Sequence, residues 1–334
     1  MNLNNNMEKE TELKLLHPRS MAAVIRDGYR LYMSSFKKLF HSSWIVAIVY
    51  AIAFALMMGN LVNNVVPIQA SVKLFGPNIV ADNPEVASTS LLTICTMLFF
   101  ALAAILLAAQ GFRAFNEHKE TETISRPKHW YGRFCLRQFV KMLPVAFWMA
   151  VLSVIVYALF AAVVYAIFSL GVVGNIWKSI ASICLLGLLA IIVVALLVPL
   201  AYTVMRALLG TASATSAKGE NSPLLLPPVK GYASGMRHWG LLFATIFVVY
   251  IFTELLTLIC ELPAVIMAVA NTEAYTGLAL GDPLGMPDNI VPLTYAIFIL
   301  AGFIQAYVHL STLFPMYYAY GSIEQQNIER QKIG

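Results

Sequence analysis

Four polar side chains interrupt two of the most apolar stretches of the chain. Glu254 and Glu261 are seven residues apart in one stretch, nearly on one helical face, and Gln305 and His309 are one turn apart in the next. Charges at membrane depth cost about 2.5–3.5 kcal/mol on insertion scales, so they normally face protein or a water-filled cavity. A carboxyl group beside an imidazole can relay protons. The same pair can form a structural hydrogen bond between two helices, which is the interpretation we favour.

Other patterns associated with catalysis are absent from the sequence. It contains no H-E-x-x-H zinc motif, no G-x-S-x-G nucleophile motif and no G-x-x-x-x-G-K-[ST] phosphate loop. The six histidines have no metal-ligand spacing, and the widely separated cysteines fit buried small hydrophobes better than disulfides: Cys95, Cys135, Cys184 and Cys260. We therefore expect no metal and no cofactor. An intramembrane enzyme assembled from isolated residues on different helices stays open as an alternative.

The composition indicates a membrane protein. Of 334 residues, 59% are hydrophobic and only 12% are charged, and the mean hydropathy is +0.74, whereas soluble domains carry roughly 25% charged residues. Crossing a hydrocarbon core takes about 20 residues of helix. Six stretches meet this requirement, at 44–64, 89–111, 143–171, 178–208, 239–270 and 291–319. The predicted fold is an all-α polytopic helical bundle with six transmembrane helices.

Several residues inside these stretches predict how the helices bend and pack. Pro199, Pro263 and Pro315 each remove a backbone donor, so we expect kinks there. Gly302 and Ala306 are small residues one turn apart, which permits a neighbouring helix to approach closely.

The distribution of basic residues predicts the orientation. If the N-terminus is cytosolic, 20 of the 22 lysines and arginines fall on the cytosolic side of the six spans, and only Lys73 and Lys178 fall on the other. This asymmetry obeys the positive-inside rule. We predict an inner-membrane protein with both termini in the cytosol. The net charge of +5 follows from this topology and requires no nucleic acid.

Amphipathic cytosolic helices are predicted before spans one, three and five. On the first, the cations lie in a narrow sector away from an apolar stripe of Met21, Ile25, Tyr32, Phe36 and Leu39, and the second repeats this design. The third, at 229–239, is weaker because Gly231 and Gly235 lower helix propensity. Such helices can lie at the headgroup boundary. The candidate lipid-headgroup residues are Arg26, Arg30, Lys37, Arg133, Arg137 and Lys141, joined by Arg113 and Arg206 at the ends of spans two and four.

Phe36, Phe139 and Trp239 precede alternate spans at intervals of about 100 residues. This spacing indicates three units that each contain a cytosolic helix and a transmembrane hairpin, although spans entering from the cytosol attract aromatic and basic flanks in any case. The predicted organisation is a cytosolic tail and interfacial helix at 1–43, a six-span domain at 44–319 and a cytosolic tail at 320–334. The candidate repeats are 20–111, 125–208 and 226–320.

The stretch RSMAAVIRDGYRLYMSSFKKLFHSSWIVAIVYAI resembles the opening of a group of bacterial multi-pass proteins. These are similar to the membrane domain attached to some glycerophosphoryl diester phosphodiesterases, and they begin with a comparable Y-R-L-Y and S-F-K-K-L-F pattern. The resemblance covers residues 20–60. It implies a helical bundle in a bacterial inner membrane that is connected with lipid or envelope physiology; no phosphodiesterase domain is present.

Three classes of function remain. The first is a non-enzymatic integral membrane protein that engages or organises membrane lipids, including anionic ones. The second is a transporter or transporter subunit that uses Glu254 and His309, and the third is an intramembrane enzyme. We favour them in that order. The sequence specifies neither a ligand nor an oligomeric state.

Overall fold

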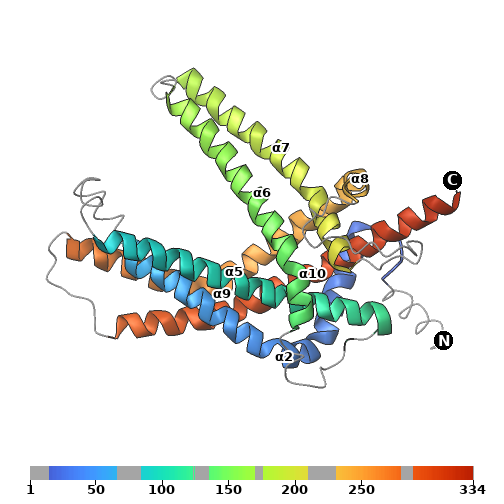
Figure 1. The fold of residues 1–334 in the computed structure, drawn as a ribbon, viewed down its shortest axis with the longest axis horizontal. Coiled ribbons are helices and arrows are strands. Elements are labelled where there is room, and N and C mark those ends of the chain that lie inside the picture. The colour runs from blue at the N-terminus through green and yellow to red at the C-terminus, as the bar shows by residue number, and fades with distance from the viewer. Residues whose placement is uncertain are drawn as a thin grey trace.

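The computed structural model describes residues 15–65, 84–122, 124, 135–169, 176–209, 231–279 and 289–333, and all regular secondary structure among them is helical. Figure 1 shows the arrangement. The helices are α2 (Met21–Asn60), the π-helical turn η1 (Leu61–Val65), α5 (Pro84–Thr121), α6 (Leu136–Ser169), α7 (Ile176–Leu209), α8 (Tyr232–Arg237), α9 (Trp239–Ala279) and α10 (Ile290–Ile333).

Six of these helices are long and apolar enough to cross a membrane. This confirms the predicted all-α polytopic bundle. The helices extend beyond the predicted spans, because polar continuations stay helical where they pack on neighbours. α2 begins at Met21 and α10 continues to Ile333, so the predicted boundaries at 43/44 and 319/320 both fall inside continuous helices.

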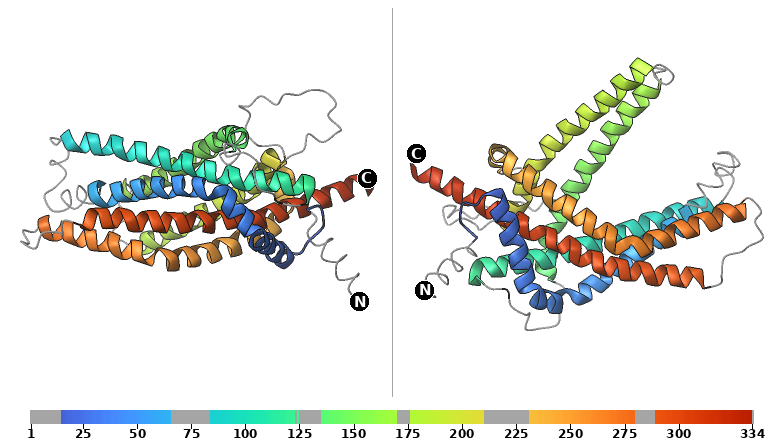
Figure 2. Two further views of the ribbon diagram at one scale, coloured as in Figure 1. Left: turned by 90° about the horizontal axis from the view of Figure 1, so that it is seen from below. Right: turned by 180° about the vertical axis from the view of Figure 1, so that it is seen from behind.

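The main bundle is built around α2 and α10, which lie side by side with α5 and α9 (Figure 2). Close approach depends on small residues. A Cβ at Gly28 of α2 would lie 2.6 Å from the Pro315 backbone of α10, and one at Gly302 would lie 2.8 Å from the Phe54 side chain. Ala306 is fully buried. The predicted role of Gly302 and Ala306 in close packing is thus confirmed.

Buried polar contacts fix the register of the helices in this bundle. The Tyr32 hydroxyl of α2 donates a 3.0 Å hydrogen bond to the Tyr307 carbonyl of α10. Farther along the bundle, Asn271 of α9 donates a 2.9 Å bond to the Thr294 hydroxyl of α10. Such contacts between membrane helices specify which faces meet, because each loses a partner if a helix slides or rotates.

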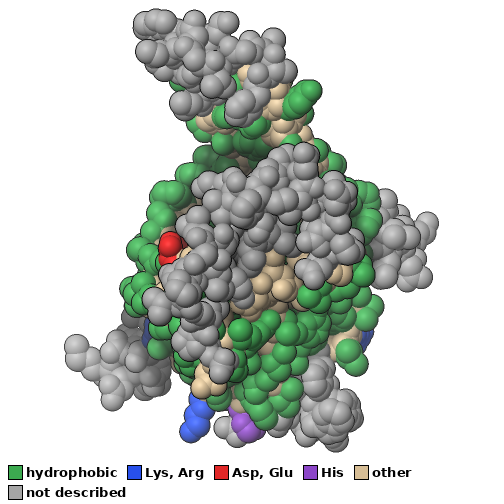
Figure 3. Space-filling model, turned by 90° about the vertical axis from the view of Figure 1, so that its left-hand side faces the viewer, with side chains coloured by type: hydrophobic (Ala, Val, Ile, Leu, Met, Phe, Trp, Pro, Cys, Tyr) green, Lys and Arg blue, Asp and Glu red, His purple; other side chains and the backbone are tan. Residues whose placement is uncertain are grey.

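The second hairpin, α6 and α7, diverges from the other four long helices (Figure 1). None of the most apolar 18-residue window of α6 is buried by the rest of the chain, against 56% of the corresponding window of α2. Seen from the end away from the termini, hydrophobic side chains cover most of the described surface (Figure 3). In a membrane protein such a surface faces lipid or other apolar partners.

The helices accommodate four internal prolines and a bend. Pro144, Pro199, Pro263 and Pro315 all lie inside continuous helices. α2 bends along its length (Figure 2). Near its middle, the Ser42 and Ser43 hydroxyls donate hydrogen bonds of 2.9 and 2.8 Å to the same Leu39 carbonyl. This type of bond back to the preceding turn commonly bends helices.

The prediction of three related units stays a prediction. The three aromatic residues proposed to be equivalent lie at different positions in their helices. Phe36 lies 15 residues after the start of α2, Phe139 lies in the first turn of α6, and Trp239 begins α9.

Candidate functional site

The termini-side end of the molecule carries the described basic side chains. The start of α2 and the end of α10 both lie there (Figure 1). The described lysine and arginine side chains all belong to segments on the terminal side of the six apolar stretches, or to their last turn. We call this the basic end. The described lysine and arginine side chains are Arg19, Arg26, Arg30, Lys37, Lys38, Arg113, Lys119, Arg137, Lys141, Arg206, Arg237, Arg330 and Lys332.

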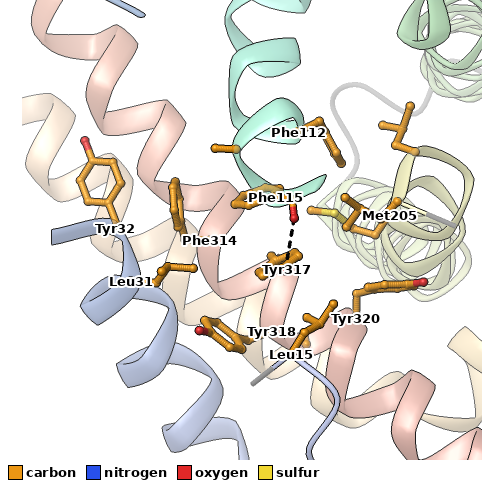
Figure 4. Close-up of a cluster of buried hydrophobic side chains, with 14 of the residues drawn as sticks. Leu15, Leu31, Tyr32, Phe112, Phe115, Met205, Phe314, Tyr317, Tyr318 and Tyr320 are labelled. Atoms are coloured by element: carbon orange, nitrogen blue, oxygen red, sulfur yellow. Dashed lines mark hydrogen bonds between the residues drawn. The ribbon is translucent and has the colours of Figure 1, made fainter. Parts of the chain in front are cut away.

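An aromatic cluster forms the rigid base of this end (Figure 4). The Phe115 ring of α5 stacks on Tyr317 of α10 with a centroid distance of 4.5 Å, and Phe314 meets Phe115 edge-on at 4.9 Å. Each such ring pair contributes about 0.5–1.5 kcal/mol beyond area burial. The Tyr317 hydroxyl donates to the Phe115 carbonyl at 3.4 Å and lies 3.0 Å from His118 Nδ1. The cluster therefore fixes α5 against α10.

A buried ion pair ties the segment before α2 to the same cluster. Arg19 Nε lies 3.0 Å from Asp27 Oδ2, and the two side chains are only 2% and 4% exposed. The guanidinium group also lies 4.6 Å from the centre of the Tyr318 ring and donates to the Leu15 and His17 carbonyls. The Arg19 backbone N–H donates to Ser322 Oγ at 2.9 Å. These contacts satisfy a charge that would otherwise be costly to bury.

The structure separates the predicted lipid-headgroup residues into distinct environments. Arg26, Arg30 and Lys37 are exposed on α2, and Arg137 and Lys141 are exposed on the first turns of α6. Arg206 is exposed, and Arg113 is half-buried, with its Nε and Nη2 lacking partners among the described residues. Arg133 lies outside those residues.

The apolar stripe predicted for the first amphipathic helix packs largely against protein, whereas the sequence predicted that it would lie at the headgroup boundary. Tyr32 and Leu39 are buried, Met21 and Ile25 are half-buried, and only Phe36 of the five is exposed. Tyr32 packs edge-on against Phe314 at 5.1 Å. This part of α2 therefore buries much of its apolar stripe against α10 rather than against lipid, because its inner face also carries the small residue that admits the neighbouring helix.

A pocket of about 290 Å³ lies at the basic end between α7, α8 and α10. Its lining includes Arg206 from α7, Ser234 and Arg237 from α8, and Glu324, Asn327 and Arg330 from α10. Sequence analysis singled out only Arg206. The other two arginines could not be grouped with it, because they belong to helices that are distant in sequence and meet only in the folded chain.

The four intramembrane candidates do not form the direct bond expected from the sequence. Glu254 is exposed on α9, and no hydrogen bond or ion pair joins it to His309 within the part of the chain that the structure describes. The buried face of α9 instead carries Thr245, Thr253 and Thr257. The Glu254 side chain is therefore exposed on α9 and makes no direct bond with His309 among the described residues.

The other intramembrane candidates have different surroundings. Gln305 is held by α2, since Tyr50 Oη donates a 3.1 Å hydrogen bond to its Oε1. Glu261 is half-buried, and its Oε1 is buried without a hydrogen-bond partner among the described residues. His309 is half-buried. A tyrosine missed by the sequence analysis thus supplies a bond between α2 and α10, whereas the bond predicted for Glu254 and His309 would have joined α9 and α10.

No family model, curated protein or solved structure matches the chain. The fold alone defines its class, a multi-pass α-helical membrane protein.

Proposed function

We propose that this is a non-enzymatic integral protein of a bacterial inner membrane, with both termini in the cytosol, which binds and organises membrane lipids, including anionic ones, at its basic end. The observation that carries the proposal is the construction of α2. One face is buried against α10 through Val24, Leu31 and Leu39, while Arg30 and Lys37 are exposed. The positive-inside distribution and the resemblance of residues 20–60 support the same proposal.

The physical basis is electrostatic attraction at a fixed surface. Anionic headgroups attract each nearby Lys or Arg with about 1 kcal/mol, and the attraction fades within a Debye length. Because the inner face of α2 is anchored by protein, its cations are held in place instead of depending on lipid to order the helix. A preordered surface loses less conformational entropy when lipid binds.

The proposal is tested by measuring which lipids stay with the full chain. The protein is reconstituted in vesicles of equal phosphatidylcholine and phosphatidylglycerol, extracted in mild detergent, and its retained lipids are quantified by mass spectrometry. We expect phosphatidylglycerol to be enriched, and R30Q/K37Q/K38Q to remove much of that enrichment. The charge-preserving variant R30K/K37R/K38R is the matched control and should retain it. Equal retention of both lipids by the wild-type protein would contradict the proposal.

A transporter is the second candidate, and Glu261 is the observation that favours it. A carboxyl oxygen buried without a partner among the described residues is costly in an apolar bundle. Such a group is explained if it receives an ion, a proton or a substrate during a transport cycle. Flux measured in vesicles with wild-type protein and E261Q separates the two candidates, since a lipid-organising role requires no flux.

A further inference from the structure

The pocket at the basic end has a lining suited to a particular kind of ligand. Three of its side chains are guanidinium groups and one is a carboxylate, so these charged groups sum to +2, from three positive charges and one negative. Ser234 and Asn327 add neutral hydrogen-bonding groups. The volume of about 290 Å³ is near the lower end of the range for small-molecule pockets, roughly 300–1,000 Å³.

The one carboxylate in the pocket is already engaged by the protein. Tyr202 Oη of α7 donates a 2.7 Å hydrogen bond to Glu324 Oε2 of α10, and Asn327 Nδ2 donates to Tyr202 Oη at 3.3 Å. Tyr202 is fully buried. Glu324 therefore helps to hold α7 against α10. Within the described residues, Arg206, Arg237 and Arg330 form no ion pair with it or with another carboxylate.

α8 is held close enough to α7 to complete the pocket. Gly231 has φ of 101°, which favours glycine, and a Cβ there would lie 2.9 Å from Arg206 Nη1. A Cβ at Gly235 would lie 2.8 Å from the Pro199 carbonyl oxygen. The Tyr232 hydroxyl and the Trp239 indole N–H donate to the Leu196 and Ala195 carbonyls at 2.9 and 3.1 Å. The two glycines, which weaken the helix, thus allow α8 to place Arg237 beside Arg206.

We propose that this pocket binds the phosphate group of a phosphomonoester. A phosphomonoester carries about −1.5 to −2 charges near pH 7, which complements the +2 of the charged lining, and its three terminal oxygens suit several guanidinium donors. A phosphodiester carries a single charge and has only two free oxygens, so it complements the pocket less well. Arg206 and Arg237 lie next to the ends of the fourth and fifth apolar spans, the level of lipid headgroups.

The phosphate site itself is argued from the pocket alone. The proposal rests on the proposed function only in the source of the phosphate, which is either a lipid headgroup or a soluble ion. The test uses the purified full chain in mild detergent. Binding is measured for phosphatidate, whose headgroup is a phosphomonoester, for phosphatidylglycerol, whose headgroup is a phosphodiester, and for inorganic phosphate. We expect wild-type protein to prefer phosphatidate to phosphatidylglycerol. Displacement of phosphatidate by inorganic phosphate would assign a site that also accepts the soluble ion, whereas no displacement would assign the lipid.

The variants identify the pocket as the origin of this preference. R206Q/R237Q/R330Q should weaken phosphatidate binding about tenfold or more, because charge-assisted hydrogen bonds are lost. R206K/R237K/R330K should restore part of it, since lysine keeps the charge but not the planar donor geometry. R137Q/K141Q removes exposed cations of the basic end that lie outside the pocket. It should weaken binding of phosphatidate and phosphatidylglycerol alike and leave the preference for phosphatidate intact.

Unaltered phosphatidate and inorganic phosphate binding in a folded R206Q/R237Q/R330Q variant would overturn the proposal. That result would leave the proposed function intact if R30Q/K37Q/K38Q still lost phosphatidylglycerol. Conversely, the phosphomonoester preference could depend on the pocket while R30Q/K37Q/K38Q has no effect on lipid retention. That result would overturn the proposed lipid surface of α2 and leave the phosphate site supported.

Discussion

Arg19 and Asp27 form a buried ion pair that joins the segment before α2 to the first turns of that helix, with 3.0 Å between Nε and Oδ2. Asp27 also accepts a 3.1 Å bond from Arg26 Nε on the solvent side. The pair therefore connects a desolvated cation to the exposed basic face of α2. Its position beside Tyr318 extends the connection to α10.

Breaking this pair should destabilise the protein more than removing both partners. D27A leaves the Arg19 cation buried without its carboxylate, and such a loss typically costs about 3–5 kcal/mol. R19M/D27L removes both charges and should recover a substantial part of that cost. Thermal unfolding of the purified chain in detergent, followed by loss of helical circular dichroism, measures the difference. A double variant no more stable than D27A would show that the charge pair is not the source of the effect.

The close contact of α2 with α10 should make Gly28 intolerant of even a methyl group. In G28A the Cβ would meet the Pro315 backbone at 2.6 Å, which cannot move as a flexible side chain can. Forced overpacking commonly costs about 1–3 kcal/mol. G240A is the matched control, since nothing lies within 4 Å of a Cβ there and alanine favours the helix. We expect G28A to lower the midpoint of thermal unfolding and G240A to maintain or raise it.

The intramembrane polar residues should differ in their effect on stability. Q305L leaves the Tyr50 hydroxyl without its acceptor and should cost about 1–3 kcal/mol. E254L replaces an exposed carboxyl group within a membrane-spanning helix, with no described hydrogen bond, by an apolar side chain and should maintain or raise stability. Unfolding midpoints of the two variants test this ranking. A folded E254Q variant that behaves in cells like a gene deletion would favour the transporter.

The proposed orientation has a direct test. A fluorescent protein that matures only in the cytosol, fused to the C-terminus after α10, should give signal, because the distribution of basic residues predicts that both termini lie on that side. A reporter active only outside the cytosol is the complementary fusion and should stay silent. The reverse pattern in well-inserted protein would reject the topology.

The sequence predicted the membrane-spanning helices well because long apolar stretches are a local signal. It divided α2 into an interfacial helix and a span and treated residues 320–334 as a tail, whereas both helices are continuous because packing, which hydropathy does not record, stabilises their polar continuations. Gly231 and Gly235 were interpreted as weaknesses of a helix, although their contacts with α7 show that they permit close packing. The candidate phosphate pocket joins Arg206, Arg237 and Arg330 from three helices, and no spacing rule links residues so far apart.

The divergence of α6 and α7 has a consequence for how the protein responds to bilayer thickness. A 34-residue helix such as α6 is about 51 Å long, against a hydrocarbon core of roughly 30 Å. With none of its most apolar window buried by the chain, lateral support for α6 comes mainly from acyl chains. Hydrophobic mismatch should therefore change the tilt of this hairpin more readily than that of α2 or α10. Pivoting by about 5° at its base would move the far tip of α6 by about 4 Å over that length.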